Sequence, residues 1–287
     1  MILYSNGCSH SRGACTLDIR DSHPLITMSS LVGKDNYKIL QYDQINPNPY
    51  TFSNHHEIIS KIKKNNHYLV YQPHFGKSNE RIFFESINFL YECIQNKLNI
   101  DYSVIQWSGV NRTISSRPSD QPPNYCDLVD VNPHDNSELG LKFEPWASAS
   151  TLQYMKILQS LYEKYNVEYV FIPYMEVGSD VFDKYPISKN LDLSRFTIHP
   201  TVGHRNEFRK KCLVCDAHGH PSQLGSYILS SMTLDLFGLN NSLIGIYDYY
   251  GDRFYSDVYK KHHGISWIKE NYNKLGDATE AIINKFR

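Results

Sequence analysis

The chain has 287 residues, which suits one large α/β domain or one domain with additions and is long enough to bury a substantial core. Its 29 Lys and Arg balance 30 Asp and Glu, and this near-neutral charge argues against a general nucleic-acid binder, whose affinity comes mostly from phosphate neutralisation. No run approaches the roughly 20 apolar residues of a membrane helix. The N-terminus lacks the basic region and apolar stretch of a signal peptide, and the six cysteines form no regular framework. We therefore expect a cytoplasmic protein with reduced thiols.

The first strand signal ends in a turn that exposes a serine. Residues 2–4 form a short apolar run typical of a buried strand, Asn6-Gly7 is a turn signal, and Ser9 follows it. In an open α/β sheet, ligands bind at the carboxyl ends of the strands. Ser9 is therefore a candidate nucleophile, which would require a general base and donors that hold the oxyanion. The alternative from this stretch alone is a serine that caps a helix.

Two further strands end in loops of small residues. Residues 67–72 are typical of a buried strand that leads to Gly76, after which Ser78 is placed to cap a long amphipathic helix. Residues 102–107 form the next strand and end in the run Gly-Val-Asn-Arg at 109–112. Strand, helix of crossover length and strand, in this order, predict a parallel sheet.

The remaining segments complete one domain with an extension. Loop signals lie at 21–24 and 46–49, a short strand is expected at 37–42, another at 167–173, and helices at 55–64, from Trp146 and from Gln223 to about Phe237. Residues 113–145 are rich in proline and polar residues and predict an inserted loop near the strand ends. We therefore predict a three-layer α/β/α domain over residues 1–239 with a parallel central sheet. Residues 240–287 form a Tyr-rich and helical C-terminal extension.

Candidates for the base and the oxyanion donors lie at the other predicted strand and helix ends. His220 stands before the last helix of the domain, with Asp216 four residues upstream. A carboxylate near an imidazole holds it in the tautomer that a general base needs. Gly76 offers a backbone N–H, and Asn111 or Asn79 offers a side-chain amide.

In this order the motifs resemble the SGNH/GDSL hydrolase family. That family has its nucleophile in a Gly-Asp-Ser turn after the first strand, a Gly in its second block, a Gly-x-Asn in its third, and an Asp-x-x-His before its last helix. The corresponding stretches here are Gly7-Cys8-Ser9, Gly76, Gly109-Val110-Asn111, and Asp216 with His220. Cys8 stands where the family has Asp, and the Asp-to-His spacing is one residue longer than in the family.

More narrowly, the chain resembles the SGNH-like proteins of tailed bacteriophages. In those, Gly-x-Ser-His-Ser/Thr opens the chain, Gly-x-Ser-Asn-x-Arg-Ile heads a long helix, and Ile-Gln-Trp closes the next strand. The matching stretches here are residues 7–11, 76–82 and 105–107, and the resemblance spans residues 1 to about 239. It implies a flavodoxin-like SGNH hydrolase fold and, for a phage-encoded protein, the cytoplasm of a bacterial host.

The resemblance also implies ester hydrolysis or acyl transfer with no cofactor and no metal. The substrate would be a small-molecule or carbohydrate acyl ester, such as an O-acetyl group on carbohydrate. The residues it implies are Ser9 as nucleophile, His220 as base, Asp216 as its orienting carboxylate, Gly76 with Asn111 or Asn79 as oxyanion donors, and His10 and Arg112 as candidates for substrate contact.

Two other functions remain open from the sequence. Four residues of the types that bind zinc lie within nine positions, namely Cys212, Cys215, His218 and His220. Structural zinc sites usually draw their ligand pairs from more distant positions. A catalytically inactive SGNH fold that acts as a binding or virion structural protein is the other alternative, because fold alone does not establish activity. The tyrosines of 240–287 suit a protein–protein contact, with a second copy or a virion protein as candidate partner.

Overall fold

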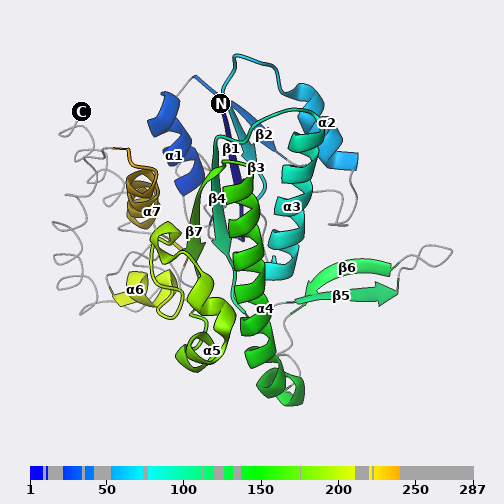
Figure 1. The fold of residues 1–287 in the computed structure, drawn as a ribbon, viewed down its shortest axis with the longest axis vertical. Coiled ribbons are helices and arrows are strands. Elements are labelled where there is room, and N and C mark those ends of the chain that lie inside the picture. The colour runs from blue at the N-terminus through cyan, green and yellow to red at the C-terminus, as the bar shows by residue number, and fades with distance from the viewer. Residues whose placement is uncertain are drawn as a thin grey trace, which may run out of the picture.

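The computed structural model describes residues 1–8, 11, 22–33, 36–41, 53–73, 77–110, 113–118, 126–131, 137–174, 176–210, 220–221 and 223–239. Its centre is a five-stranded sheet in the order β2-β3-β1-β4-β7, and every pairing is parallel (Figure 1). The strands are β1 (Ile2–Asn6), β2 (Lys38–Gln41), β3 (Tyr68–Tyr71), β4 (Tyr102–Trp107) and β7 (Glu168–Pro173). The parallel sheet predicted from the sequence is thereby confirmed.

Helices cover both faces of the sheet, which gives the predicted three layers (Figure 1). On one face lie α1 (His23–Val32) and α7 (Gln223–Leu236), joined by a 3.0 Å hydrogen bond between the hydroxyls of Thr27 and Ser230. On the other face lie α2 (Ser53–Lys61), α3 (Asn79–Gln95) and α4 (Ser137–Lys164). Side chains alternate along each strand, so that Leu3 packs in the cluster of the first face and Tyr4 in that of the second.

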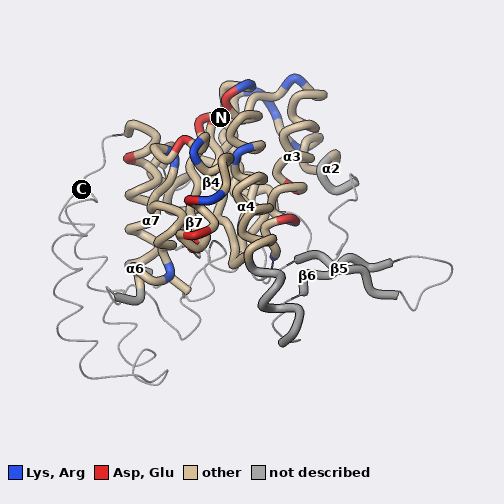
Figure 2. Tube along the Cα trace, turned by 60° about the horizontal axis from the view of Figure 1, so that its bottom comes forward, with Lys and Arg blue, Asp and Glu red and all other residues tan. Residues whose placement is uncertain are grey.

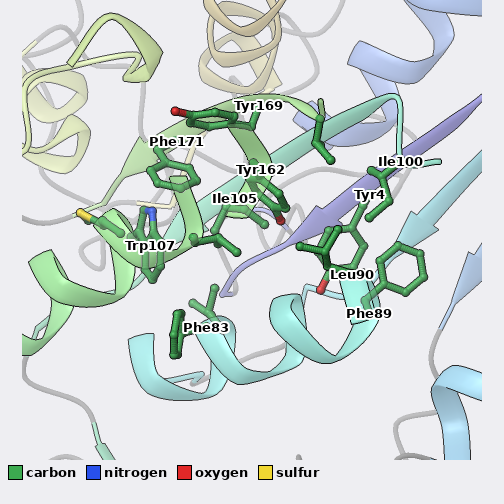
Figure 3. Close-up of a cluster of buried hydrophobic side chains, with 14 of the residues drawn as sticks. Tyr4, Phe83, Phe89, Leu90, Ile100, Ile105, Trp107, Tyr162, Tyr169 and Phe171 are labelled. Atoms are coloured by element: carbon green, nitrogen blue, oxygen red, sulfur yellow. The ribbon is translucent and has the colours of Figure 1, made fainter. Parts of the chain in front are cut away.

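The second face carries an aromatic core between the sheet and α3 (Figure 3). Tyr4 of β1 stacks on Phe89 of α3 with ring centroids 4.5 Å apart, and Trp107 meets Phe171 edge-on at 5.3 Å. These rings are almost fully buried. Stacked and edge-to-face pairs add to the free energy gained from burying aromatic area, so this core packs α3 against β1 and β4 against β7.

Short helices link β7 to α7. They are α5 (Ser179–Lys184), η3 (Pro186–Asn190), η4 (Leu193–Arg195) and α6 (His204–Lys210). Phe208 of α6 packs in the same hydrophobic cluster as residues of α1 and α7, so α6 belongs to the layer on the first face. The last helix ends near the start of β4, where Phe237 meets Tyr102 at a centroid distance of 4.7 Å.

Two of the predicted loops contain regular structure. The expected inserted loop at 113–145 holds an antiparallel hairpin of β5 (Thr113–Pro118) and β6 (Cys126–Val131), and α4 begins at Ser137 rather than at Trp146. Pro145 counted toward the predicted loop because proline usually breaks a helix. In the structure it lies inside α4 at an exposed position, and the long helix continues through it. Likewise Pro24, taken as a loop signal, lies in the first turn of α1, where its missing N–H has no helical partner to lose.

The helices on the second face return to the sheet through left-handed residues. Lys97 after α3 has a φ of 55°, and Asn166 after α4 has a φ of 54°. In each case the next residue donates back into the last turn, Leu98 to Cys93 and Val167 to Tyr162. This is the hydrogen-bond pattern of a Schellman helix end, and it brings the chain to the amino edge of the sheet.

Acidic and basic residues are interspersed over the described part of the chain (Figure 2), as the balanced composition suggests. Among the described helices, none has the length and hydropathy required to span a bilayer. The predicted extension at 240–287 lies outside the described residues.

Candidate active site

The topology of the sheet marks one place for a ligand. From the carboxyl end of β1 the chain runs toward β2, and from the carboxyl end of the neighbouring β4 it runs toward β7 on the opposite side. The crevice between two such strands is the switch point where open α/β sheets bind their ligands. The segments that carry Ser9 and Asn111 follow these two strands, although both residues lie outside the described part of the chain.

The turn after β1 is closed at the two residues that flank Ser9 and His10. The backbone N–H of Ser11 donates to the carbonyl of Cys8 at 3.1 Å. The carbonyl of Ser11 accepts a hydrogen bond from the Tyr71 hydroxyl of β3 at 3.2 Å. The Ser11 hydroxyl donates to the side-chain amide oxygen of Gln106 in β4. Both neighbouring strands therefore hold the turn.

Gly7 is required where this turn approaches β4. A Cβ at this position would lie 2.6 Å from the Ser11 hydroxyl oxygen and 2.9 Å from the Cβ of Gln106. Such contacts leave no room for a side chain, so a glycine at this position of the turn has a steric reason.

A neutral chain of hydrogen bonds continues from the turn to β7. Gln106 accepts from Ser11, and its amide nitrogen lies 3.4 Å from Nε2 of the buried His204. Nδ1 of His204 lies 2.5 Å from the carbonyl oxygen of Pro173. Because a carbonyl only accepts, Nδ1 carries the proton and Nε2 accepts from Gln106. We call Ser11, Gln106, His204 and the Pro173 carbonyl the neutral chain.

Burial keeps the histidines of this region uncharged. Burial lowers the pKa of His204 to about 4, against the opposing effect of its bond to the Pro173 carbonyl. His23, at the start of α1, is fully buried, and burial together with the nearby His204 lowers its pKa to about 3. Neither ring nitrogen of His23 has a hydrogen-bond partner in the structure as described.

A charged cluster holds the other side of the β1 end. The amide oxygen of Asn6 accepts from the N–H of Gly7 at 2.8 Å and from the ammonium of Lys77 at 2.9 Å. Lys77 also donates to the Gln72 carbonyl at 2.5 Å and to the carboxylate of Glu85. We call Asn6, Lys77, Glu85 and Arg81 the charged cluster, since Arg81 donates to the second oxygen of Glu85 at 3.0 Å.

The carboxylate of Glu85 stays ionised inside the protein. Burial acts to raise its pKa, but the adjacent charges and hydrogen bonds of Lys77 and Arg81 outweigh burial and lower the pKa. Glu85 and Lys77 are both almost fully buried, whereas Arg81 is partly exposed.

Asn79, a candidate oxyanion donor, forms a bridge between α3 and the end of β4. Its amide nitrogen donates to the Ser108 carbonyl and to the Thr151 hydroxyl, both at 3.1 Å, and its amide oxygen accepts from the Ser108 N–H at 2.6 Å. Both amide hydrogens are therefore engaged, and the bridge ends three residues before Asn111. The helix cap is Ser78, which accepts from the Arg81 N–H as predicted.

The remaining predicted site residues are described only in part. His220 is half-buried just before α7, while Ser9, His10, Gly76, Asn111, Arg112 and Asp216 lie outside the described residues. The zinc alternative also falls there, except for His220. Among the described residues, no group of His, Cys, Asp or Glu is arranged to hold a metal ion.

Sequence reasoning missed Lys77, Glu85, Gln106 and His204. Their partners lie on other elements, and a single charged or amide residue carries no periodic signal. One signal was available: Glu85 falls among the apolar positions of the amphipathic helix between Ile82 and Phe89, where an acidic residue needs a partner.

No family model and no curated protein matches the chain. Two solved structures are similar to it. LAE5, an α/β hydrolase enzyme from the metagenome of Lake Arreo in Spain, is 11% identical over 84% of this chain and 96% of its own, with a TM-score of 0.37. A mutant acetyl-xylooligosaccharide esterase from Geobacillus is 12% identical over 83% of this chain and 94% of its own, with a TM-score of 0.36. Both similar proteins are hydrolases, and likeness at this level does not place the chain in a family.

Proposed function

We propose that the chain is a serine esterase of SGNH type that hydrolyses or transfers an O-acyl group. The observation that supports it is the anchoring of the residues around Ser9. Cys8 and Ser11 are joined to each other, and Ser11 is tied to β3 and β4 at the switch point of the sheet. A nucleophile needs such fixed surroundings, because its oxygen must stay within a fraction of an ångström of the attack geometry.

In this proposal the chemistry follows the serine hydrolase scheme. Ser9 Oγ attacks the ester carbonyl while His220 takes its proton, and Asp216 stabilises the resulting imidazolium. The backbone N–H groups of Ser9 and Gly76 and an asparagine amide hold the oxyanion. His220 then protonates the leaving alcohol, and water or an acceptor alcohol attacks the acyl-enzyme to release Ser9.

The proposed substrate is an acyl ester of a carbohydrate or of a small metabolite, with O-acetyl as the first choice. The resemblance to phage proteins supports a carbohydrate ester as the substrate. It also supports the cytoplasm of a bacterial host as the location of the protein. His10 and Arg112 flank the predicted nucleophile and the predicted asparagine in sequence, so we propose that they contact the substrate. The scheme uses neither a metal nor a cofactor.

The test is replacement of Ser9. We expect Ser9→Ala to remain folded and to lose hydrolysis of p-nitrophenyl acetate by several orders of magnitude, because the mutant lacks the attacking oxygen. A fluorophosphonate probe should label the wild-type chain and not the mutant. Ser60→Ala on the exposed surface of α2 is the matched control and should behave as wild type. Mutant activity within about tenfold of wild type would exclude Ser9 as the nucleophile.

The same experiments separate the alternatives. A wild-type chain that is folded, unlabelled and inactive on short esters would favour an inactive SGNH fold with a binding or virion role. Stoichiometric zinc that is lost on Cys212→Ser would favour the metal-binding alternative.

A further inference from the structure

Lys77 is a buried cation whose hydrogens are all used. Its side chain is only 2% exposed, and its ammonium donates to Asn6, to the Gln72 carbonyl and to Glu85. An ammonium has three hydrogens, so this group has no donor left for a substrate. Any contribution of Lys77 to a reaction must therefore pass through the residues that it holds.

The acceptors of Lys77 belong to three different elements. Asn6 ends β1, Gln72 follows β3, and Glu85 lies in the second turn of α3. The bond to the Gln72 carbonyl closes the connection between β3 and α3 at its two ends, since Lys77 is the last residue before the Ser78 cap. The bond to Asn6 joins that connection to the turn after β1, because Asn6 also holds the Gly7 N–H.

A buried ion pair is a costly way to join elements. Removing two charges from water offsets most of their attraction, so apolar residues of similar size often stabilise a fold as well. What apolar residues do not provide is direction, because only a set of aimed hydrogen bonds fixes one segment relative to another. The Lys77–Glu85 pair is therefore better explained by the positions it sets than by stability.

We propose that Lys77 is a positioning residue that holds the loop of Gly76 against the turn of Ser9. The inference rests on the proposed function, in which these two segments supply an oxyanion donor and the nucleophile. Gly76 directly precedes Lys77, and Ser9 is three residues after Asn6. A shift of about 1 Å between such groups costs on the order of 10²-fold in rate.

The experiment removes both charges together. In the double variant Lys77→Met with Glu85→Gln, the Lys77–Glu85 pair is removed as a whole, and Arg81, which loses the carboxylate, is partly exposed to water. The fold should therefore survive better than in either single variant. We expect a melting temperature close to wild type, an unchanged KM for p-nitrophenyl acetate and a kcat lower by about 10²-fold. The rate of fluorophosphonate labelling at Ser9 should fall in parallel, because labelling uses the same oxyanion donors.

Two control variants separate positioning from general effects. Lys61→Met removes a lysine from an exposed ion pair on α2 and should leave melting temperature and kcat unchanged. Leu158→Ala removes buried side-chain volume from α4 and should lower the melting temperature without lowering kcat. A double variant that is stable and keeps kcat within about threefold of wild type would overturn the inference, because a shift of the donors should cost far more.

If the double variant does not fold, Lys77→Arg decides. A planar guanidinium keeps the charge but cannot place three donors where one nitrogen stood, so kcat should fall with KM unchanged. A folded Lys77→Arg with wild-type kcat would overturn the inference. A wild-type chain that neither hydrolyses the ester nor is labelled would overturn the proposed function, and this inference with it.

Discussion

The end of β1 is held from two sides by networks of opposite character. Toward α3, the charged cluster joins Asn6 to Lys77, Glu85 and Arg81. Toward β7, the neutral chain runs from Ser11 through Gln106 to His204. The charged cluster is sensitive to the loss of either Lys77 or Glu85, because removing one leaves the charge of the other buried without its partner. Breaking the neutral chain should cost less stability, because none of its members is charged. It requires, however, that His204 carries its proton on Nδ1.

The two networks also differ in what they hold. The charged cluster links the turn after β1 to the loop of a neighbouring strand, whereas the neutral chain links the same turn across β4 to the end of β7. Of the described residues on either side of Ser9 in the sequence, Asn6 is therefore held by a network that is sensitive to the removal of charge, and Ser11 by one that is sensitive to the addition of charge. Acid and mutation should affect the two sides differently.

The largest expected effect is the loss of the carboxylate from the charged cluster. Glu85→Gln alone leaves the ammonium of Lys77 buried without its counter-charge, and removing one partner of a buried pair typically costs about 3–5 kcal/mol. Urea denaturation measures this loss. Glu57→Gln, which breaks an exposed pair on α2, is the control and should cost far less, because water screens the exposed charges. Equal losses in the two variants would contradict a buried cluster.

Low pH should destabilise the protein through the buried histidines, one of which belongs to the neutral chain. Both His204 and His23 have pKa values below the 6.5 of an unperturbed histidine, at about 4 and about 3. The unfolded chain then binds more protons, so the stability due to these groups is complete above pH 6.5 and falls as the pH drops toward 4. Each histidine should contribute a slope of about 1.4 kcal/mol per pH unit in that window.

Urea midpoints between pH 7 and pH 5 measure this slope. His204→Gln should make it shallower, because one titrating group is removed and the amide still bonds. A slope unchanged in His204→Gln would mean that His204 is not held neutral.

A smaller loss of stability is expected from the centre of the neutral chain. Gln106→Leu removes the acceptor of the Ser11 hydroxyl and the amide that faces Nε2 of His204, while the bond of Nδ1 to the Pro173 carbonyl remains, at a cost of about 1–3 kcal/mol. Gln159→Leu is a matched control, because this buried amide bonds both backbone groups of Asp192 away from the site. Both variants should lose similar stability in urea, but only Gln106→Leu should lower kcat. A kcat loss in Gln159→Leu as well would remove the special role of the neutral chain.

The last pair of variants separates the two asparagines. Asn79→Ala removes the bridge to Ser108, with about 1 kcal/mol for each net hydrogen bond lost, and should mainly lower the melting temperature. Asn111→Ala should mainly lower kcat, by roughly 10²–10³-fold for a true oxyanion donor, with little change in KM. Steady-state kinetics and thermal denaturation of the two variants decide, and the reverse pattern would assign the oxyanion role to Asn79.

The parts of the fold that the sequence predicted rest on local signals. The apolar runs at 68–71 and 102–107 become buried strands, and Ser78 caps α3 through a contact only three residues away. Pro24 misled because the same residue type marks a loop and the first turn of a helix. The hairpin of β5 and β6 was missed because its prolines and polar residues favour a loop on composition alone.

For the site, the sequence identified candidate residues, and the structure identified the residues that contact the segments around them. The order of motifs pointed to Ser9, Asp216 and His220, and their mutual geometry stays a prediction. The hydrogen bonds that hold the neighbouring residues could not be predicted from the sequence, because Ser11 and Gln106 are 95 residues apart and Asn6 and Lys77 are 71 apart. Such contacts depend on the order of strands in the sheet, which no local pattern encodes.

The left-handed residues at the amino edge have a consequence for how this protein can be strengthened. A non-glycine residue such as Lys97 at φ 55° bears a steric penalty of about 1–2 kcal/mol, and glycine would relieve it. The greater freedom of glycine in the unfolded chain offsets roughly 0.5–1 kcal/mol of that gain. Lys97 and Asn166 stand at the edge of the sheet opposite the switch point. Thermal tolerance could therefore be adjusted at these two helix ends without touching the groups proposed for catalysis.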